Sequence, residues 1–170
     1  MVRHLNIDGN TQGDSNGHGS ICRAVFVYQL DFYHYREQQL GRHDFYFGQF
    51  GENFTVDDLS DAAVYIGDRY RIGNALFEVT QPRTTGYHVG IRMHEPRMAA
   101  LLVSRRRPGF YFRVLQKGDV PAGNEIIKVA EGLERITVTE LDGMLCWLLR
   151  ALYITIELPH QKKEVDNHNE

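Results

Sequence analysis

Short apolar runs separated by glycine and polar turns occupy most of the first 130 positions of this 170-residue chain. The run 24–28 is rich in β-branched and aromatic residues, as in strands that are buried on both faces. Two later runs, 110–115 and 125–129, are separated by a stretch that contains glycine and proline, and they predict two more strands. This spacing of short runs predicts a mainly β domain.

A β-hairpin is predicted in the middle of the chain. Tyr70 and Ile72 alternate with two arginines, and the Gly73-Asn74 pair that follows is typical of a two-residue hairpin turn. The second strand of the hairpin is expected over residues 76–79. The pattern then breaks at residues 81–86, because proline donates no backbone hydrogen bond, and a loop is expected there.

Helical periodicity marks three other segments. Residues 30–40 have apolar positions at three- and four-residue spacings and are followed by Gly41, a residue suited to a left-handed helix cap. A short amphipathic helix is expected near residues 98–105. In the last third, residues 137–140 fit a capping box, and leucines line one helical face between residues 141 and 152. The predicted fold class is mainly β with helical inserts and a C-terminal helix.

The composition is that of an ordinary globular protein, with 42% hydrophobic residues and a formal net charge of −3. The basic run at residues 105–107 stands alone in this net-negative chain, so a nucleic-acid partner is not expected. No apolar run approaches the ~18 residues that a membrane span needs, and the first residues lack the apolar stretch of a signal peptide. We therefore expect a cytoplasmic protein that does not contact a membrane.

The cysteines, histidines and lysines exclude several kinds of site. With two cysteines, Cys22 and Cys146, the chain can form neither a disulfide framework nor a four-cysteine zinc site. Its histidines lack the ligand spacing of a zinc site, so no metal-ligating residues are predicted. None of the four lysines lies in a motif that would anchor pyridoxal phosphate.

Four segments combine glycine or proline with side chains that can contact an anion or a polar ring: 8–19, 50–54, 81–83 and 109–113. A glycine-rich loop can present several backbone N–H groups to a phosphate, and arginine side chains can pair with phosphate oxygens. Each segment taken alone also has an explanation without a ligand. The first is then a surface turn, the second a hydrogen-bonded pair of polar side chains, and Arg113 the partner of a carboxylate across the sheet.

Taken together and in this order, the segments resemble the MOSC domain, named for the C-terminal domain of molybdenum cofactor sulfurases. The matching stretches are 8–25, 47–56, 66–73, 78–83 and 109–115. Within the family the chain looks most similar to the group joined in longer chains to a reductase that contains flavin and an iron–sulfur centre. The resemblance implies a reductase as one partner.

The resemblance also implies a division of the chain into three parts. Residues 1–130 correspond to a MOSC-type β-barrel, shortened at its start and lacking its first strand or strands. Residues 131–158 correspond to an abbreviated helical segment, and residues 159–170 form a polar tail. An open barrel edge and an uncovered leucine stripe would be available to a partner, including a second copy of the chain.

The function implied by the resemblance is binding of a molybdenum–pterin cofactor, in a family with links to oxidoreductases and sulfur carriers. By motif, Arg83 and Arg113 would contact the phosphate and pterin edges of the cofactor, and the other side chains would line its pocket. The side chains carried over in this way are Asp14, His18, Glu52, Asn53, Arg83 and Arg113. The looser association of the wider family with pyridoxal phosphate is not expected to apply here.

One position departs from the family motif. The family's cysteine a few residues after Gln-Pro-Arg aligns with Gly86, so the thiolate that would ligate molybdenum or carry sulfur is missing. We therefore expect a cofactor-binding domain with impaired activity. One alternative is an active molybdenum-dependent reductase of N-hydroxylated compounds that uses another ligand, for which Cys22 is the candidate. The other is a non-catalytic interaction or assembly domain.

Overall fold

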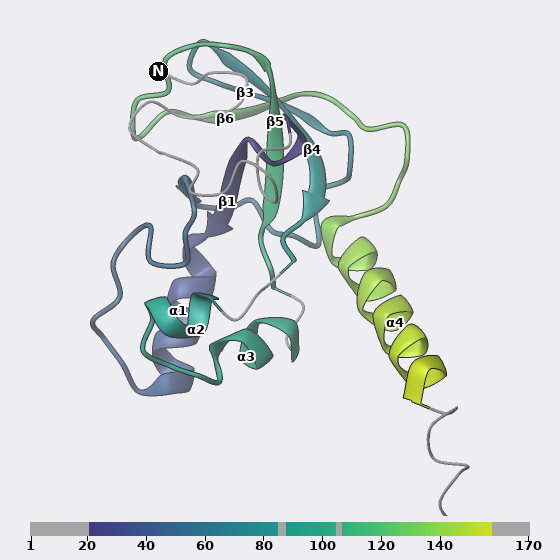
Figure 1. The fold of residues 1–170 in the computed structure, drawn as a ribbon. Helices are drawn as coiled ribbons and strands as arrows, with labels where there is room; N and C mark the ends of the chain where they lie inside the picture. The colour runs from purple at the N-terminus through teal and green to yellow at the C-terminus, as the bar shows by residue number, and fades with distance from the viewer. Residues whose placement is uncertain (1–20, 85–87, 105–106, 158–170) are drawn as a thin grey trace, which may run out of the picture.

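The computed structural model describes residues 21–84, 88–104 and 107–157. Within these ranges six strands form one curled sheet in the order β2-β1-β5-β4-β3-β6, in which β1 and β2 are parallel and the other pairs are antiparallel (Figure 1). The strands are β1 (Val25–Gln29), β2 (Phe54–Val56), β3 (Arg69–Ile72), β4 (Ala75–Pro82), β5 (Phe110–Gln116) and β6 (Ile126–Ala130).

The helices fall into two groups in space. The described ones are the 3₁₀ turn η1 (Ile21–Arg23) and the helices α1 (Leu30–Leu40), α2 (His88–Arg92), α3 (Met98–Ser104) and α4 (Val138–Glu157). Figure 1 shows α1, α2 and α3 together at one end of the sheet, whereas α4 points away from it on the other side. The predicted fold class, mainly β with helical inserts and a C-terminal helix, is confirmed.

Strand β1 divides the hydrophobic core into two clusters. Val25 and Val27 pack into the interior of the curled sheet, in a cluster to which β3, β4 and β5 also contribute. Phe26 and Tyr28 point the opposite way and pack with residues of α1, α2 and α3. We call the first the barrel cluster and the second the helical cluster. Every residue of β1 is buried, because alternate side chains of a strand point to opposite faces and both faces are covered here.

The predicted hairpin is present between β3 and β4. Ile72 pairs with Ala75, and Gly73 occupies the turn with a φ of +56°. A Cβ atom at Gly73 would lie 2.4 Å from the carbonyl oxygen of Asp119, so the turn requires glycine for its conformation and for the approach of the neighbouring loop.

Both predicted helix caps are also present. Gly41 ends α1 in the left-handed conformation with a φ of +63°. At the start of α4 the Glu140 carboxylate accepts hydrogen bonds of 2.8 Å from the backbone N–H and from the hydroxyl of Thr137, and the Glu140 N–H donates to the Thr137 hydroxyl oxygen at 3.1 Å. These contacts form the capping box, and they lower the pKa of Glu140.

The structure differs from the sequence-based expectation in three places. The prediction that a loop begins at residue 81 is wrong, because β4 continues through Gln81 and Pro82. The register of its pairing with β5 shifts after Val79. Proline is tolerated there because it is the last residue of the strand. Strand β2 and helix α2 were not predicted, since runs of three and five residues carry no measurable periodicity.

The leucine stripe of α4 remains largely uncovered among the described residues. Trp147 is 70% exposed and Leu149 is 63% exposed. Capping therefore fixes where this helix begins, whereas packing on the sheet covers little of its length. None of the helices in the described part of the chain combines the length and apolar character needed to cross a membrane.

Candidate functional site

The segments 81–83 and 109–113 meet beside β1. The backbone N–H of Arg83 donates to the carbonyl oxygen of Gly109 at 3.0 Å. Gly109 has a φ of +74°, and a Cβ atom there would lie 2.5 Å from the carbonyl oxygen of Val27. The glycine of this motif is therefore required by the close approach of two backbones, which brings the Arg83 side chain over β1.

Arg83 presents a half-buried cation with a buried donor that has no described partner. Its guanidinium lies over the ring of Phe26, with Cζ 4.5 Å from the ring centroid. Its Nη1 atom is buried and has no hydrogen-bond partner among the described residues. Burial lowers the pKa of this guanidinium, while nearby Tyr111, Tyr28 and Glu52 act to raise it. A half-buried guanidinium with such an N–H group favours an anionic partner.

A second arginine, Arg92 of α2, strengthens the positive potential at this place. The positive charge of Arg92 repels that of Arg83 and so lowers the pKa of Arg83 further. The Nη1 atom of Arg92 lies 3.5 Å from the position that a Cβ atom on Gly51 would take, so its guanidinium rests against the loop that carries Glu52. Nothing in the sequence around Arg92 marked it, because a five-residue helix brings it to the site.

Glu52 is held at the site by three donors and keeps one oxygen open. Its Oε1 atom accepts hydrogen bonds from the Tyr33 hydroxyl, from the Gly48 backbone N–H at 2.7 Å and from the Thr55 hydroxyl at 3.0 Å. Burial and the adjacent Glu52 charge raise the pKa of Tyr33, because ionisation would place two negative charges together. The Oε2 atom is buried and has no partner in the described ranges, so it can accept a hydrogen bond from a ligand.

Asn53 holds the backbone of Phe26 in place. Its side-chain Oδ1 accepts from the Phe26 N–H at 2.7 Å, and its own N–H donates to the Phe26 carbonyl oxygen at 2.8 Å. This contact continues the pairing of β1 with the chain that enters β2. Asn53 thereby fixes Phe26, the ring on which Arg83 lies, and its amide oxygen is already engaged.

Arg113 lies on the same side of the sheet but is already paired. Its Nη2 atom forms an ion pair of 2.5 Å with Glu78 Oε1, which faces it across β4 and β5. Arg69 binds the other oxygen of Glu78 at 2.9 Å. Because residues two apart on a strand share a face, Arg113 and Tyr111 point the same way, and the Tyr111 ring lies 5.4 Å from that of Phe26. The Nε atom of Arg113 is buried without a described partner.

These contacts define one surface, which we call the arginine face: Phe26, Arg83, Arg92, Tyr111 and Arg113, with Glu52 at its margin. Of the six side chains selected from the sequence, Glu52 and Arg83 come together here. Arg113 lies on the same face of β5 as Tyr111, and Asn53 holds the backbone of Phe26. Asp14 and His18 lie outside the described residues, as does Gly86. Cys22 is close by, since its carbonyl oxygen lies 2.6 Å from the hydroxyl oxygen of Thr80, which also lies 3.0 Å from the Tyr111 carbonyl oxygen.

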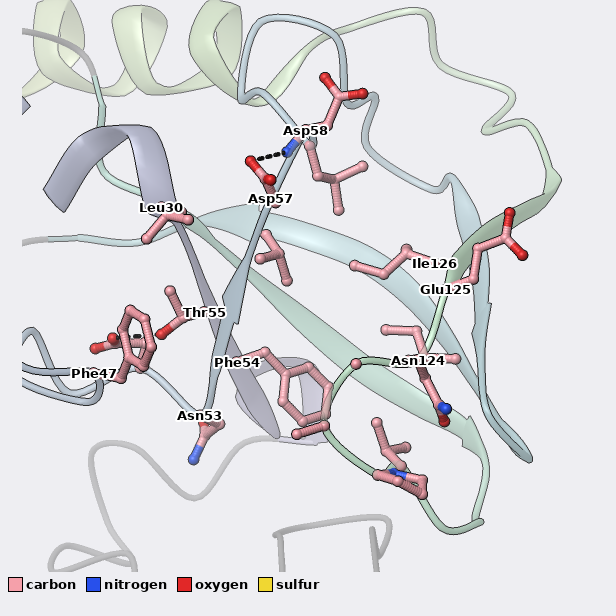
Figure 2. A pocket seen from close by; sticks show the side chains of 18 of the residues that line it. Leu30, Phe47, Asn53, Phe54, Thr55, Asp57, Asp58, Asn124, Glu125 and Ile126 are labelled. Atoms are coloured by element: carbon pink, nitrogen blue, oxygen red, sulfur yellow. Dashed lines mark hydrogen bonds between the residues drawn. The ribbon is translucent and has the colours of Figure 1, made fainter. Parts of the chain in front are cut away.

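A cavity lies elsewhere, between β2 and β6, the first and last strands in the sheet order. It has a volume of about 950 Å³, and Figure 2 shows Phe54 of β2 on one side and Ile126 of β6 on the other. Asp57, Asp58 and Glu125 also line it. Glu52 and Asn53 line its margin, but Arg83 and Arg113 do not. Glu52 therefore lies between this cavity and the arginine face.

A buried acid that the sequence did not mark positions Gly109. Asp61 accepts hydrogen bonds from the Gln29 side-chain amide at 2.7 Å and from the Gly109 N–H at 3.0 Å. Burial is the main cause that raises the pKa of Asp61 to about 6. Asp61 thus connects the end of β1 with the turn that enters β5. Across the described residues, no three His, Cys, Asp or Glu side chains cluster as a metal site.

Comparisons with known proteins show the family of the chain. A family model for the MOSC domain matches residues 14–127. The uncharacterized protein YflK of Bacillus subtilis is 33% identical over 138 residues, which make up 81% of this chain and 62% of YflK. A protein from Gibberella moniliformis named "Reductase" is 36% identical over 115 residues, which cover 66% of this chain and 20% of that protein.

Solved structures share the fold. The crystal structure of YiiM from Escherichia coli matches with a TM-score of 0.72 and 26% identity, over 85% of this chain and 68% of that chain. In sequence YiiM is 30% identical over 142 residues, which are 82% of this chain and 63% of YiiM. In the sequence matches the chain thus spans less than two thirds of the length of YflK and of YiiM.

Proposed function

The chain belongs to the MOSC domain family, and from this membership we propose that it binds a molybdenum–pterin cofactor at the arginine face. The single observation that carries the proposal is the buried, unpartnered Nη1 atom of Arg83 among the described residues, next to a second guanidinium. A half-buried guanidinium with an exposed one nearby favours a phosphate over a neutral group.

The donor and acceptor set at the arginine face fits such a cofactor. Arg83 and Arg92 would hold the phosphate, since both carry planar donor groups and lie within electrostatic reach of each other. The open Oε2 atom of Glu52 would accept a hydrogen bond from an N–H group of the pterin. Arg113 would contact the far edge by leaving Glu78. When bound, the cofactor supplies a redox-active molybdenum centre.

We propose that the domain binds this cofactor with impaired activity, in keeping with glycine at position 86. This chain's own residues would bind and orient the cofactor, and Phe26 and Tyr111 would exclude water from one side of it. No thiolate stands at the motif position after Arg83. The kinship with a protein named "Reductase" supports descent from an oxidoreductase component.

The proposal is tested by purifying the chain from a host that makes the cofactor. Elemental analysis measures molybdenum per chain, and fluorescence of the oxidised pterin measures the organic part. We expect both in equal amounts, and we expect Arg83→Met to reduce both at least tenfold. Arg97→Met is the matched control, because Arg97 is exposed and pairs with Glu95 alone among the described carboxylates. Equal occupancy in Arg83→Met and the unaltered chain would reject the arginine face.

The second candidate function is an active reductase of N-hydroxylated compounds that uses Cys22 in place of the missing thiolate. The contact between Thr80 and the Cys22 carbonyl oxygen favours it, because Thr80 lies on β4 three residues before Arg83. Turnover of a hydroxylamino substrate by the cofactor-loaded chain, lost in Cys22→Ser with unchanged molybdenum content, would support this candidate. Turnover that survives in Cys22→Ser would remove Cys22 from the mechanism.

A further inference from the structure

A second cavity lies where the end of β1 meets the beginnings of α1 and α4. Its volume is about 410 Å³. Gln29 ends β1, Asp31 lies in the first turn of α1 and Thr139 lies in the first turn of α4, and all three line this cavity. No residue of the arginine face lines it. We call it the aspartate cavity, because Asp31, Asp58 and Asp61 form part of its wall.

Gln29 brings an unused acceptor to the aspartate cavity. The residue is 4% exposed. Its Nε2 atom donates at 2.7 Å to the Leu59 carbonyl oxygen and at 2.7 Å to Asp61 Oδ1, so both N–H groups are engaged and the orientation of the amide is fixed. Its Oε1 atom is buried and has no hydrogen-bond partner among the described residues. A buried oxygen in this condition favours a ligand that brings an N–H or O–H group.

Negative charge exceeds positive charge around this acceptor. Besides the three aspartates of the wall, the buried Asp142 acts on Asp61 with its charge. The described wall contains one cation, Arg107. The N-termini of α1 and α4 contribute about half a positive charge each, which leaves an excess of about two negative charges. The surroundings of Gln29 therefore favour a cation.

Arg107 is engaged by aromatic rings of α1. Its Cζ atom lies 5.0 Å from the centroid of the Phe32 ring and 5.1 Å from that of Tyr35. Its charge acts on Asp61 more weakly than that of Asp142 does. Asp31 is exposed, so its carboxylate can turn toward a ligand in the cavity.

The carboxylate of Asp58 faces the same region. Asp58 belongs to the walls of both cavities. In Figure 2 its carboxylate points away from Phe54 and Ile126, which line the other cavity. Asp58 is exposed and has a φ of +55°. Two exposed carboxylates, on the first turn of α1 and on the loop after β2, therefore flank the buried oxygen of Gln29.

The open atom and the charge together select the class of ligand. An anion would meet an acceptor and an excess of negative charge, and a water molecule would leave that charge uncompensated. Within the described ranges no three His, Cys, Asp or Glu side chains are grouped as a metal site. An ammonium group is a compact cation with three N–H donors. The buried ring of Phe32, also in the wall, offers an apolar contact for the rest of such a ligand.

We propose that the aspartate cavity binds a small primary alkylammonium ion, which donates a hydrogen bond to Gln29 Oε1. Its charge lies between the carboxylates of Asp31 and Asp58, and its alkyl part contacts Phe32. The site joins β1 to the first turns of two helices and does not depend on cofactor binding at the arginine face.

The first experiment is calorimetric titration of the whole chain with n-butylammonium at pH 8, with sodium chloride adjusted to keep the ionic strength constant. At this pH the Asp61 carboxyl, whose pKa is about 6, is ionised. We expect saturable binding to one site. Tetramethylammonium has the same charge and the same number of carbon atoms but no N–H group, so it should bind about tenfold more weakly. Absence of n-butylammonium binding, or equal affinity for the two ions, overturns the proposal.

Charge variants test the two exposed carboxylates. Asp31→Asn and Asp58→Asn keep the shape of each side chain, and asparagine adopts the positive φ of residue 58 readily. Each should weaken n-butylammonium binding about threefold, and the double variant about tenfold. Asp57→Asn is the matched control, because Asp57 is the exposed neighbour that lines the other cavity and not this one. Unchanged affinity in the double variant, or an equal loss in Asp57→Asn, overturns the proposal.

Nuclear magnetic resonance locates the ligand without any variant of the site. The side-chain amide signals of Gln29 should shift during the n-butylammonium titration with the affinity found by calorimetry, because Oε1 of the same amide accepts the new hydrogen bond. Shifts that instead centre on the Gly48 N–H, at the other cavity, overturn the proposal. Arg83→Met should bind n-butylammonium as the unaltered chain does, so failure of the cofactor proposal leaves this result untouched.

Discussion

The two core clusters on either side of β1 are built from similar aromatic and aliphatic side chains but differ in their polar content. The barrel cluster consists of apolar residues such as Val27, Phe77 and Phe112. The helical cluster is built from buried aromatic and aliphatic residues too, yet Arg36 of α1 and Arg83 next to it keep buried guanidinium nitrogen atoms without described partners. The barrel side of the strand keeps one such atom, Gln29 Oε1, among the described residues. The other side carries the arginine face, where we propose that the cofactor binds.

This difference gives the two faces of β1 different roles. A close-packed apolar interior supplies stability and holds the strands in register. Buried donors without acceptors reduce stability and are retained where a ligand completes them. Under the proposed function, β1 therefore joins an apolar side that supplies stability to a side that the cofactor would complete.

The largest expected effect comes from the barrel cluster. Phe112→Ala should lower the free energy of unfolding by about 3–5 kcal/mol, because it removes a fully buried ring that packs against Phe77, Phe110 and Tyr70. Denaturant unfolding followed by circular dichroism measures this loss. A loss below 1 kcal/mol would show that the barrel side is not the stabilising one.

The next largest effect is a pH dependence of the free energy of unfolding, caused by Asp61, which connects the end of β1 with the turn before β5. Asp61 has a pKa of about 6 in the folded chain and of 3.8 in the unfolded chain. Between pH 3.8 and pH 6 the native state therefore keeps a proton on Asp61 that the unfolded state has lost. Stability should therefore decrease as the pH rises from about 4 to 6 and change no further above that range, by about 3 kcal/mol in total. Unfolding free energies measured across this range, in the unaltered chain and in Asp61→Asn, give the two slopes.

Asp61→Asn cannot titrate, so its profile should lack this decrease while other groups contribute equally to both proteins. The same slope in both would assign the pH dependence to other groups. The Asn variant also offers one oxygen in place of two, so its curve should lie lower throughout.

The smallest effect is expected on the helical side. Tyr33→Phe removes one of the three donors to Glu52 Oε1 and should cost about 1–2 kcal/mol of folding free energy. It should also weaken cofactor binding, since Glu52 is then held less firmly. Denaturant unfolding and molybdenum content measure the two effects. A cost as large as that of Phe112→Ala would contradict the contrast between the two sides.

Local patterns were sufficient for the parts of the fold whose cause is local. The hairpin at Gly73, the left-handed cap at Gly41 and the capping box at Thr137 each depend on a few adjacent residues, and each is present. The burial of β1 on both faces followed from its composition. Strand β2 could not be predicted in this way, because it exists only through its pairing with β1.

The candidate site shows the same limit. The order of the motifs led to Arg83 and Glu52, and the structure brings them to one margin of the sheet. Arg92 carried no motif, because it reaches this place through the packing of the short helix α2 and not through its neighbours in sequence. The open alternative for Arg113, a carboxylate across the sheet, corresponds to its contact with Glu78, and its part in cofactor binding stays a prediction.

The sharing of Glu78 by two guanidinium groups has one more consequence. Arg69, which is half exposed, can keep the carboxylate neutralised while Arg113 swings away. When Arg113 turns toward an arriving negative group, Glu78 therefore keeps a positive partner. The free-energy cost that remains is the loss of rotamer freedom of the Arg113 side chain. The pair of strands β4 and β5 thus holds one guanidinium, that of Arg113, which can change partner without leaving Glu78 unpaired.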